Sequence, residues 1–275
     1  MLEEQLEACA RAITRADGLL VTAGAGMGVD SGLPDFRGRE GFWRAYPVLR
    51  KAGMDFLSIA CPDTFRRDPR LAWGFYGHRL KLYRETIPHE GFAILQRLAR
   101  HMPKGAFVFT SNVDGQFQKA GFSSGEICEC HGSIHFLQCL EGCERKIWAA
   151  ERFDPVVDEV GCQLVSPLPV CSRCGDTARP NVLMFGDWGW LDFCVREQEA
   201  RLKQWLATVT RLVIIEIGAG KHIPTVRHVG EFQEGFLIRI NPREPELPSG
   251  RRGVGLPLSG LEGLQRIQAA LESSP

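Results

Sequence analysis

The chain has 275 residues and a formal net charge of zero, and this length suits one large domain or one domain with a smaller insertion. Apolar residues make up 44% and charged residues 24%, as in an ordinary globular protein. The balanced charge gives no basis for electrostatic attraction to nucleic acid or anionic lipid. No apolar run approaches the roughly 20 residues that cross a membrane, and the N-terminus lacks an apolar signal core, so we expect a cytoplasmic protein without a membrane partner.

Apolar segments alternate with helical patterns along most of the chain. Residues 2–13 carry apolar side chains at helical spacing, and short apolar runs predict buried strands at 19–22, 106–110, 212–217 and 236–240. Helical patterns at 91–101 and 195–209 stand before the second and third strands, and a last amphipathic helix is expected at 261–273. This order predicts an α/β fold with a Rossmann-like parallel sheet and helices on both faces.

Two regions interrupt this alternation. Residues 41–88 are rich in aromatic and basic side chains and look helical, and residues 139–174 carry paired cysteines and prolines. We expect both to be insertions that form a smaller second lobe. The predicted large domain comprises 1–40, 89–133 and 183–275, with a helical insertion at 41–88 and a cysteine-rich module at 134–182. Residues 241–260 are rich in Pro and Gly and are expected to form a loop.

Four of the ten cysteines have the spacing of a metal site. Cys139-x3-Cys143 is followed after 27 residues by Cys171-x2-Cys174, and Gly175 permits a tight turn behind the second pair. Two such pairs supply the four sulfur ligands of a structural Zn²⁺, which leaves no open position for chemistry. Four unrelated buried cysteines are the alternative. Cys128 and Cys130, with His131, are rival ligands, but a C-x-C pair has poor geometry for this role.

The segment "VTAGAGMGVDSGLPDFRG", residues 21–38, begins like a nucleotide-binding loop but departs from the usual fingerprint. Gly24 and Gly26 fit G-x-G-x-x-G, whereas the third glycine position falls on Val29. Further polar segments stand beside expected strand ends at 110–122, 130–139, 217–224 and 238–244. Because ligands of parallel sheets bind beyond the carboxyl ends of the strands, we expect these segments to meet in one crevice.

The ordered set of motifs resembles the sirtuins, the NAD-dependent protein deacylases. The family pattern runs GAG…SGIPDFR, T-Q-N-[IV]-D, HG, two cysteine pairs, GTS and IN. This chain offers Gly24-Ala25-Gly26, residues 31–37 reading SGLPDFR, Asn112-Val113-Asp114, His131-Gly132, the cysteine quartet, Gly218-Ala219-Gly220 and Ile240-Asn241. The match spans nearly the whole chain in the same order.

The resemblance implies a role for each NAD-facing residue. Gly24, Ala25 and Gly26 would approach the pyrophosphate, and Asp35, Phe36 and Arg37 would lie on a loop over the nicotinamide ribose. Ser111, Asn112 and Asp114 would line the nicotinamide pocket. The adenosine half would bind at Gly218, Ala219, Gly220 and Asn241. His131 would be the general base, since imidazole titrates near neutral pH and can take a proton from a ribose hydroxyl. Asn112 is expected to take part in catalysis with it.

The resemblance also implies a substrate, which would be an acyl-lysine protein or peptide. The segment "RPNVLMFGDWGW" matches the family segment beside the acyl-lysine channel, so Phe185 and Gly186 are expected to border it. Tyr76-x-x-Arg79 matches a pair that binds the carboxylate of succinyl- or malonyl-lysine in one sirtuin class, and Arg grips carboxylates bidentately. The alternative is an inward Tyr and a solvated Arg on one helix.

Departures from the pattern leave other functions open. Gly28 stands where the family has Ser, Ser111 replaces Gln, Gly-Ala-Gly replaces GTS, and "QFQKAG" replaces LHxxAG. The 111–122 wording also resembles a sirtuin branch associated with protein mono-ADP-ribosylation, in which the histidine is replaced. Because His131 is kept, deacylation is favoured over ADP-ribosyl transfer, while Ser111 and Gly28 leave open an NAD-hydrolysing or NAD-binding protein without a protein substrate. Without the other motifs, His131 would be a structural or surface residue and Asn112-x-Asp114 a turn or helix cap. His135 and His222 are expected to be structural or surface residues.

Overall fold

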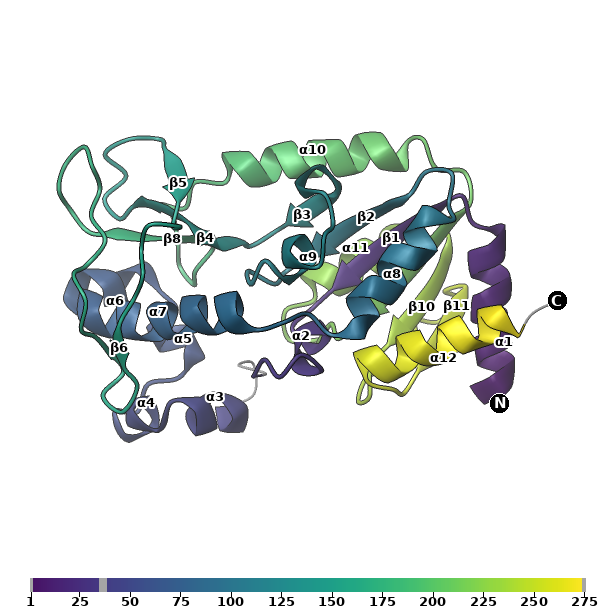
Figure 1. Ribbon diagram of the computed structural model, residues 1–275, viewed down its shortest axis with the longest axis horizontal. Coiled ribbons are helices and arrows are strands. Elements are labelled where there is room, and N and C mark those ends of the chain that lie inside the picture. The colour runs from purple at the N-terminus through teal and green to yellow at the C-terminus, as the bar shows by residue number, and fades with distance from the viewer. Residues whose placement is uncertain (1, 35–38, 274–275) are drawn as a thin grey trace.

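The computed structural model describes residues 2–34 and 39–273 and is built on a six-stranded parallel sheet (Figure 1). Its order is β11-β10-β9-β1-β2-β3, so the first strand of the chain lies in the interior of the sheet. The strands are β1 (Gly18–Ala23), β2 (Ala106–Thr110), β3 (Ile127–Glu129), β9 (Leu212–Ile217), β10 (Phe236–Ile240) and β11 (Gly253–Leu256). This arrangement brings the loops after β1, β2, β9 and β10 to one edge.

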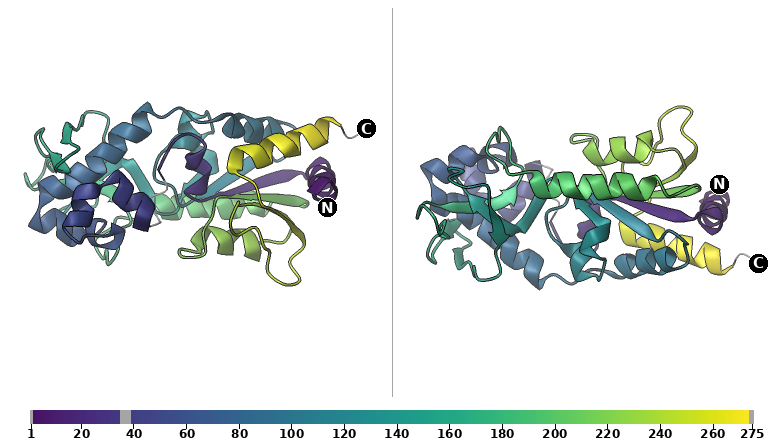
Figure 2. Two further views of the ribbon diagram at one scale, coloured as in Figure 1. Left: turned by 90° about the horizontal axis from the view of Figure 1, so that it is seen from below. Right: turned by 90° about the horizontal axis from the view of Figure 1, so that it is seen from above.

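Helices cover both faces of the sheet (Figure 2). One face carries α1 (Leu2–Arg15), α8 (Glu90–Arg100) and α12 (Gly260–Glu272), and the other carries α10 (Phe193–Leu206) and α11 (Thr225–Phe232). β1 and β2 are buried along their whole length, since both of their faces are covered. The fold class predicted from the sequence is confirmed.

The four expected strands are present in the six-stranded sheet, and its other two strands were not expected. β3 has three residues and supplies the edge beside β2. β11 lies inside the segment predicted to be a Pro/Gly-rich loop, so that prediction is wrong for Gly253–Leu256. Both strands are too short to show a hydrophobic period, and β11 contains two glycines, which favour turns when they are read locally.

The two insertions share one hydrophobic core and form the smaller lobe. The first contributes α3 (Arg39–Ala45), α4 (Pro47–Lys51), α5 (Phe56–Ile59), α6 (Pro62–Arg67) and α7 (Pro69–Glu85). The second contributes β4 (Gly132–Cys139), β5 (Ile147–Ala149) and β8 (Ala178–Val182), in the order β5-β4-β8, and the hairpin of β6 (Val157–Asp158) and β7 (Gln163–Leu164). The domain boundaries remain a prediction.

Helix α7 joins the two parts of this lobe. Asp68 caps its N-terminus by accepting a hydrogen bond from the Leu71 N–H, as a capping carboxylate does. The indole Nε1 of Trp73 donates to the Ala178 carbonyl of β8 at 2.8 Å. At Gly74 a Cβ would lie 2.0 Å from the Cys162 carbonyl oxygen, so only glycine lets the helix approach this closely.

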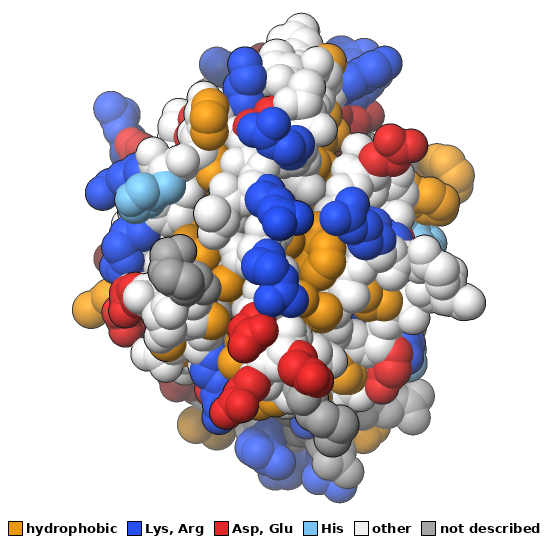
Figure 3. All heavy atoms as spheres, turned by 90° about the vertical axis from the view of Figure 1, so that its right-hand side faces the viewer, with side chains coloured by type: hydrophobic (Ala, Val, Ile, Leu, Met, Phe, Trp, Pro, Cys, Tyr) orange, Lys and Arg blue, Asp and Glu red, His pale blue; other side chains and the backbone are white. Residues whose placement is uncertain are grey.

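Three short helical segments complete the chain, namely α2 (Gly26–Val29), α9 (Gln116–Lys119) and the 3₁₀ turn η1 (Ser124–Glu126). On the surface at the right of Figure 1, Lys and Arg side chains form a column beside hydrophobic ones (Figure 3). Over the described residues, the length and hydropathy that a bilayer-spanning helix needs are not met by any helix.

Candidate active site

Two adjoining pockets lie at the edge of the sheet where β1, β2, β9 and β10 end. The first has a volume of about 530 Å³ and the second about 430 Å³, and both are lined by Ala25 and Ile223. Volumes of this size suit small-molecule ligands. The first pocket faces the smaller lobe, and the second lies over the loops after β9 and β10. The crevice predicted from the strand ends is therefore present.

The glycines after β1 and β9 pack backbone against backbone. A Cβ at Gly24 would lie 2.6 Å from the Gly218 carbonyl oxygen, and one at Gly26 would lie 2.6 Å from the Gly218 Cα. Gly218 itself has φ = 60°, a conformation that favours glycine. The N–H groups of Gly24 and Gly26 donate to the carbonyls of Ile217 and Gly218, at 2.9 and 3.1 Å. These glycines are thus required by the packing of the two loops.

Gly28, which stands where the family has a serine, packs against Leu33. A Cβ at position 28 would lie 2.9 Å from the Leu33 Cδ1, and both residues are buried. Leu33 therefore occupies the space into which a serine side chain at position 28 would project.

The residues after β2 are held rigidly against the β1 loop. The Asn112 Nδ2 donates to the Gly24 carbonyl at 3.0 Å, and the Asn112 N–H donates to the Thr110 Oγ1 at 3.0 Å. The Ser111 N–H donates to the Ala23 carbonyl at 3.2 Å. Ser111 and Asn112 line the first pocket, although each is less than one tenth exposed. That this pocket receives nicotinamide stays a prediction.

Asp114 lines the same pocket and is almost fully buried. Its Oδ1 accepts from the Gln116 N–H at 2.9 Å, and burial raises the pKa of its carboxyl to about 6. The carbonyl of Asp114 lies 2.9 Å from the His135 Nε2. His135 therefore has a structural contact, in agreement with its expected role.

His131 lies in the two-residue turn between β3 and β4 and lines the first pocket. Its backbone is fixed on both sides: the Cys130 N–H donates to the Thr110 carbonyl at 2.9 Å, and the Leu183 N–H donates to the His131 carbonyl at 2.9 Å. Glu129 is buried two residues earlier, and burial, reinforced by the charge of Asp114, raises the pKa of its carboxyl to about 8.

The expected acyl-lysine side of the pocket gathers residues from both lobes. The residues that line it are Tyr76, Arg79, Phe185 and Gly186, together with Tyr83, which belongs to no sequence motif. The Nε and Nη2 of Arg79 donate to the Tyr83 hydroxyl at 3.0 and 2.8 Å. Arg79 is only 8% exposed, so the alternative of a solvated Arg is excluded. Tyr83 follows Arg79 by four residues on α7, a spacing that places the two side chains on one face.

Only some of the residues predicted to bind the adenosine half of NAD line the same pocket. Gly218, Gly220 and Asn241 line the second pocket, together with His222, which had been expected to be structural or on the surface. Ala219 does not line it, because its side chain is buried in the core. Instead the Ala219 carbonyl accepts from the Asn241 Nδ2 and the Arg227 Nε, both at 3.0 Å. Arg227, which no motif marked, thus holds this loop in place.

Asp35, Phe36 and Arg37 lie outside the described residues. Their predicted place over the ribose stays a prediction.

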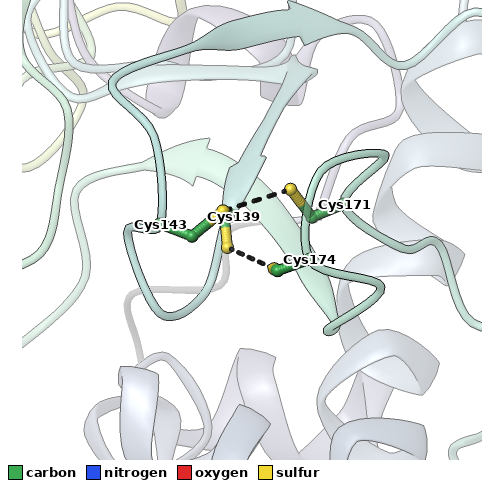
Figure 4. Close-up of side chains that lie close together, drawn as sticks. All are labelled: Cys139, Cys143, Cys171 and Cys174. Atoms are coloured by element: carbon green, nitrogen blue, oxygen red, sulfur yellow. Dashed lines mark hydrogen bonds between the residues drawn. The ribbon is translucent and has the colours of Figure 1, made fainter.

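The four predicted metal ligands converge in the smaller lobe (Figure 4). The sulfur atoms of Cys139, Cys143, Cys171 and Cys174 lie within 4.8 Å of one another. Cys139 and Cys174 are 3.7 Å apart at sulfur, and Cys143 and Cys171 are 3.6 Å apart. Tetrahedral coordination with Zn–S bonds near 2.3 Å places sulfurs about 3.8 Å apart. The donor set therefore fits a structural Zn²⁺, and Cys128 and Cys130 are packed in the core instead.

The comparisons with known proteins agree with this geometry. A sequence model described as the Sir2 family matches residues 24–204. The chain belongs to the Sir2 family, the sirtuins. It is 31% identical over 220 residues to an NAD-dependent protein deacylase of Pyrococcus furiosus, covering 79% of each chain. It is also 32% identical over 267 residues to one of Thermus thermophilus, covering 95% of this chain and 93% of the relative.

Solved Sir2 structures share the fold. A Sir2 homologue in complex with NAD superposes with a TM-score of 0.73 at 22% identity, covering 97% of this chain and 94% of that chain. A Sir2 protein with a deacetylated peptide and an acetyl-ADP-ribose superposes with a TM-score of 0.67 at 18% identity, covering 96% and 98%. The two-lobed arrangement seen here is therefore that of the Sir2 fold.

Proposed function

We propose that this protein is an NAD-dependent protein lysine deacylase. Its reaction would use NAD as cosubstrate, release nicotinamide and transfer the acyl group to ADP-ribose. One observation carries the proposal: a single pocket is lined by His131, by Asn112 and Asp114 from the β2 loop, by Arg79 of the smaller lobe, and by Phe185 of the segment after β8. The named relatives, which are NAD-dependent protein deacylases, support the same activity.

The residues of the chain would divide the work between the two pockets. The second pocket, with Gly220 and Asn241, would hold the adenosine half of NAD, and the shared Ala25 would border the path to the first. The half-buried His131 would take the proton from a ribose hydroxyl as general base. The closed four-sulfur site would hold Zn²⁺, which would stabilise the smaller lobe without contacting the reaction.

The test uses the full chain with NAD and acetyl-lysine peptides, read by mass spectrometry. Loss of acyl mass from the peptide, together with acyl-ADP-ribose in solution, is the expected result. His131→Ala should reduce the rate at least about 100-fold, since general bases contribute at this scale. Gain of ADP-ribose mass on protein would indicate an ADP-ribosyltransferase instead, and free ADP-ribose alone would indicate an NAD hydrolase.

A finer proposal concerns the acyl group, which we infer can carry a terminal carboxylate. The guanidinium of Arg79 is buried in the pocket wall, and the Tyr83 hydroxyl orients it. Burial raises the pKa of the Tyr76 hydroxyl, which therefore stays a neutral hydrogen-bond donor at physiological pH. A succinyl or malonyl carboxylate would find a cation and a donor here.

Arg79→Met tests this finer proposal. Desuccinylation should fall about 30- to 100-fold relative to deacetylation, because the carboxylate loses charge-assisted hydrogen bonds. Lys81→Met is the matched control, since Lys81 is exposed on the same helix, and it should leave both rates unchanged. If Arg79→Met lowered the two rates equally, Arg79 would not select the acyl group.

The partner that we propose is accordingly an acyl-lysine protein or peptide. We also propose, from the sequence alone, that the protein works in the cytoplasm, which cell fractionation would test.

A further inference from the structure

Trp188 is fully exposed, and its exposure needs a reason. Its side chain is 100% accessible, yet it lines the first pocket. Leu183 and Phe185 on the same segment, between β8 and α10, are 39% and 37% exposed and line the pocket too. Exposed apolar side chains that gather beside a binding pocket mark a contact surface for a ligand.

The backbone that carries Trp188 is fixed on both sides. The preceding residue, Asp187, forms a bidentate ion pair with Arg179 of β8: Nη1 lies 2.5 Å from Oδ2, and Nη2 lies 2.9 Å from Oδ1. Both side chains are 1% exposed. The carbonyl of the following residue, Gly189, accepts from the buried Gln138 Nε2 of β4 at 2.8 Å. The backbone at Trp188 is therefore anchored to β8 and β4, and this fixes where the exposed indole lies.

Asp187 also closes the segment on itself. Its carboxylate accepts from the N–H groups of Met184, at 3.4 Å, and Gly189, at 3.1 Å. Two residues before Asp187, the Phe185 N–H donates to the Ala60 carbonyl at 3.0 Å, and the Phe185 ring packs edge-on against Phe56 with ring centroids 5.9 Å apart. The segment thus joins the zinc-binding module to the helical insertion.

The segment 183–191 is apolar apart from one buried carboxylate. The only acidic group of residues 183–191 is Asp187, whose charge is buried and compensated by Arg179. A large apolar side chain would gain contact area with the indole and with Leu183 and Phe185. A cation would gain from the indole face alone, since no carboxylate of this segment is available to it.

We infer that Trp188 is a specificity-determining residue that receives a large apolar side chain next to the acyl-lysine of the substrate. Asp187 is the positioning residue that holds it, through its ion pair with Arg179. This inference rests on the proposed deacylase function and deepens it: the substrates would be proteins in which a modified lysine has an apolar neighbour.

The experiment uses the full chain, NAD and a panel of acetyl-lysine peptides that differ only at the two positions on either side of the lysine. Phe, Leu, Lys, Glu or Gly is placed there, and kcat and KM are measured. The wild-type chain should show a KM about 5- to 20-fold lower for the Phe and Leu peptides than for the Gly peptide. Trp188→Ala should reduce this difference to within about twofold.

Two further variants test whether the position of the Trp188 side chain matters as well as its presence. Asp187→Asn should raise the KM for Phe and Leu peptides while Trp188 is still present, and Asp187→Glu, which keeps the charge, should recover part of the affinity. Thermal denaturation should show all variants folded at the assay temperature. Phe232→Ala is the matched control, because Phe232 is an aromatic residue, 81% exposed, that lines a hollow remote from this pocket. It should match the wild type on every peptide.

Equal KM values across the panel would overturn the inference, and so would a preference that survives Trp188→Ala. A preference for the Lys peptide would also overturn it and would indicate a cationic neighbour instead. These outcomes differ from a failure of the proposed function, in which no peptide of the panel would lose its acetyl group.

Discussion

The Asn112 side chain ties the loop after β2 to the loop after β1, because its Nδ2 donates to the Gly24 carbonyl at 3.0 Å. Gly24 in turn contacts the loop after β9 closely, so one side chain links three strand ends. Asn112, which is predicted to take part in catalysis, thus also holds the backbone of the pocket in place.

Asn112→Asp should therefore lower kcat/KM more than Asn112→Ala does. Aspartate places an acceptor against the Gly24 carbonyl and repels it, whereas alanine only removes the bond, at a cost of about 1 to 3 kcal/mol, or roughly 10- to 100-fold. Steady-state assays with NAD and an acetylated peptide measure both variants. Equal activity of the two would show that the bond to Gly24 does not matter.

Removal of the metal should unfold the smaller lobe. A chelator, or Cys174→Ser, should release about one equivalent of Zn²⁺ and lower the melting temperature by about 10 °C or more, since a structural zinc site contributes directly to folding. Elemental analysis and thermal denaturation measure the two effects. Cys194→Ser is the control, because this half-buried cysteine lies outside the cluster. A stable, metal-free wild-type chain would contradict the assignment.

Stability should fall as pH rises from about 6 to 9. The carboxyl of Glu129 has its pKa raised from the usual 4.5 to about 8, so its proton is bound more tightly in the folded state than in the unfolded state. The stabilisation is complete at low pH and is lost as pH rises through 8. The carboxyl of Asp114, with a pKa raised to about 6, lowers the stability in the same way over a lower pH range.

Urea unfolding at pH 6 and pH 9 measures this effect. The free energy of unfolding of the wild-type chain should fall by about 2 to 3 kcal/mol over this range. Glu129→Gln, which does not titrate, should fall by less. Identical pH profiles for the two proteins would show that Glu129 does not carry the dependence.

A buried ion pair lies inside the main sheet. The Nε of Arg239 on β10 donates to the Glu216 Oε1 of β9 at 2.6 Å, and both side chains are 1% exposed. Arg239→Met should destabilise the fold by about 3 to 5 kcal/mol, because it leaves the buried carboxylate of Glu216 with only the longer ion pair to Arg227, at 4.0 Å. Arg239→Met combined with Glu216→Leu should recover much of this loss. Denaturant unfolding of the single and the double variant measures these changes in the free energy of unfolding. If the two substitutions destabilised the fold additively, the prediction would be contradicted.

Much of the fold follows from local sequence patterns. β2, β9 and β10 begin and end where the apolar runs do, because strands covered on both faces are continuously apolar. β3 and β11 could not be found in this way, since partners supplied by other parts of the chain stabilise them. The quartet of cysteines was predictable because metal ligands have fixed spacing.

The candidate site was predictable where a motif exists and not where tertiary packing decides. Tyr83 and Arg227 belong to no motif, and only the structure shows that one orients Arg79 and the other holds the Ala219 carbonyl. Ala219 was assigned to the second pocket from its place in the pattern, but its side chain packs into the core. A motif marks a segment of backbone, whereas packing decides which atoms of that segment face the pocket.

Gly28 and Leu33 couple two positions in the first turn of the site. A methylene group at position 28 would meet the Leu33 Cδ1 at 2.9 Å, so a serine there requires the end of the leucine side chain to rotate or shorten. An engineered Gly28→Ser chain should therefore accommodate the new side chain more easily when position 33 carries a smaller residue.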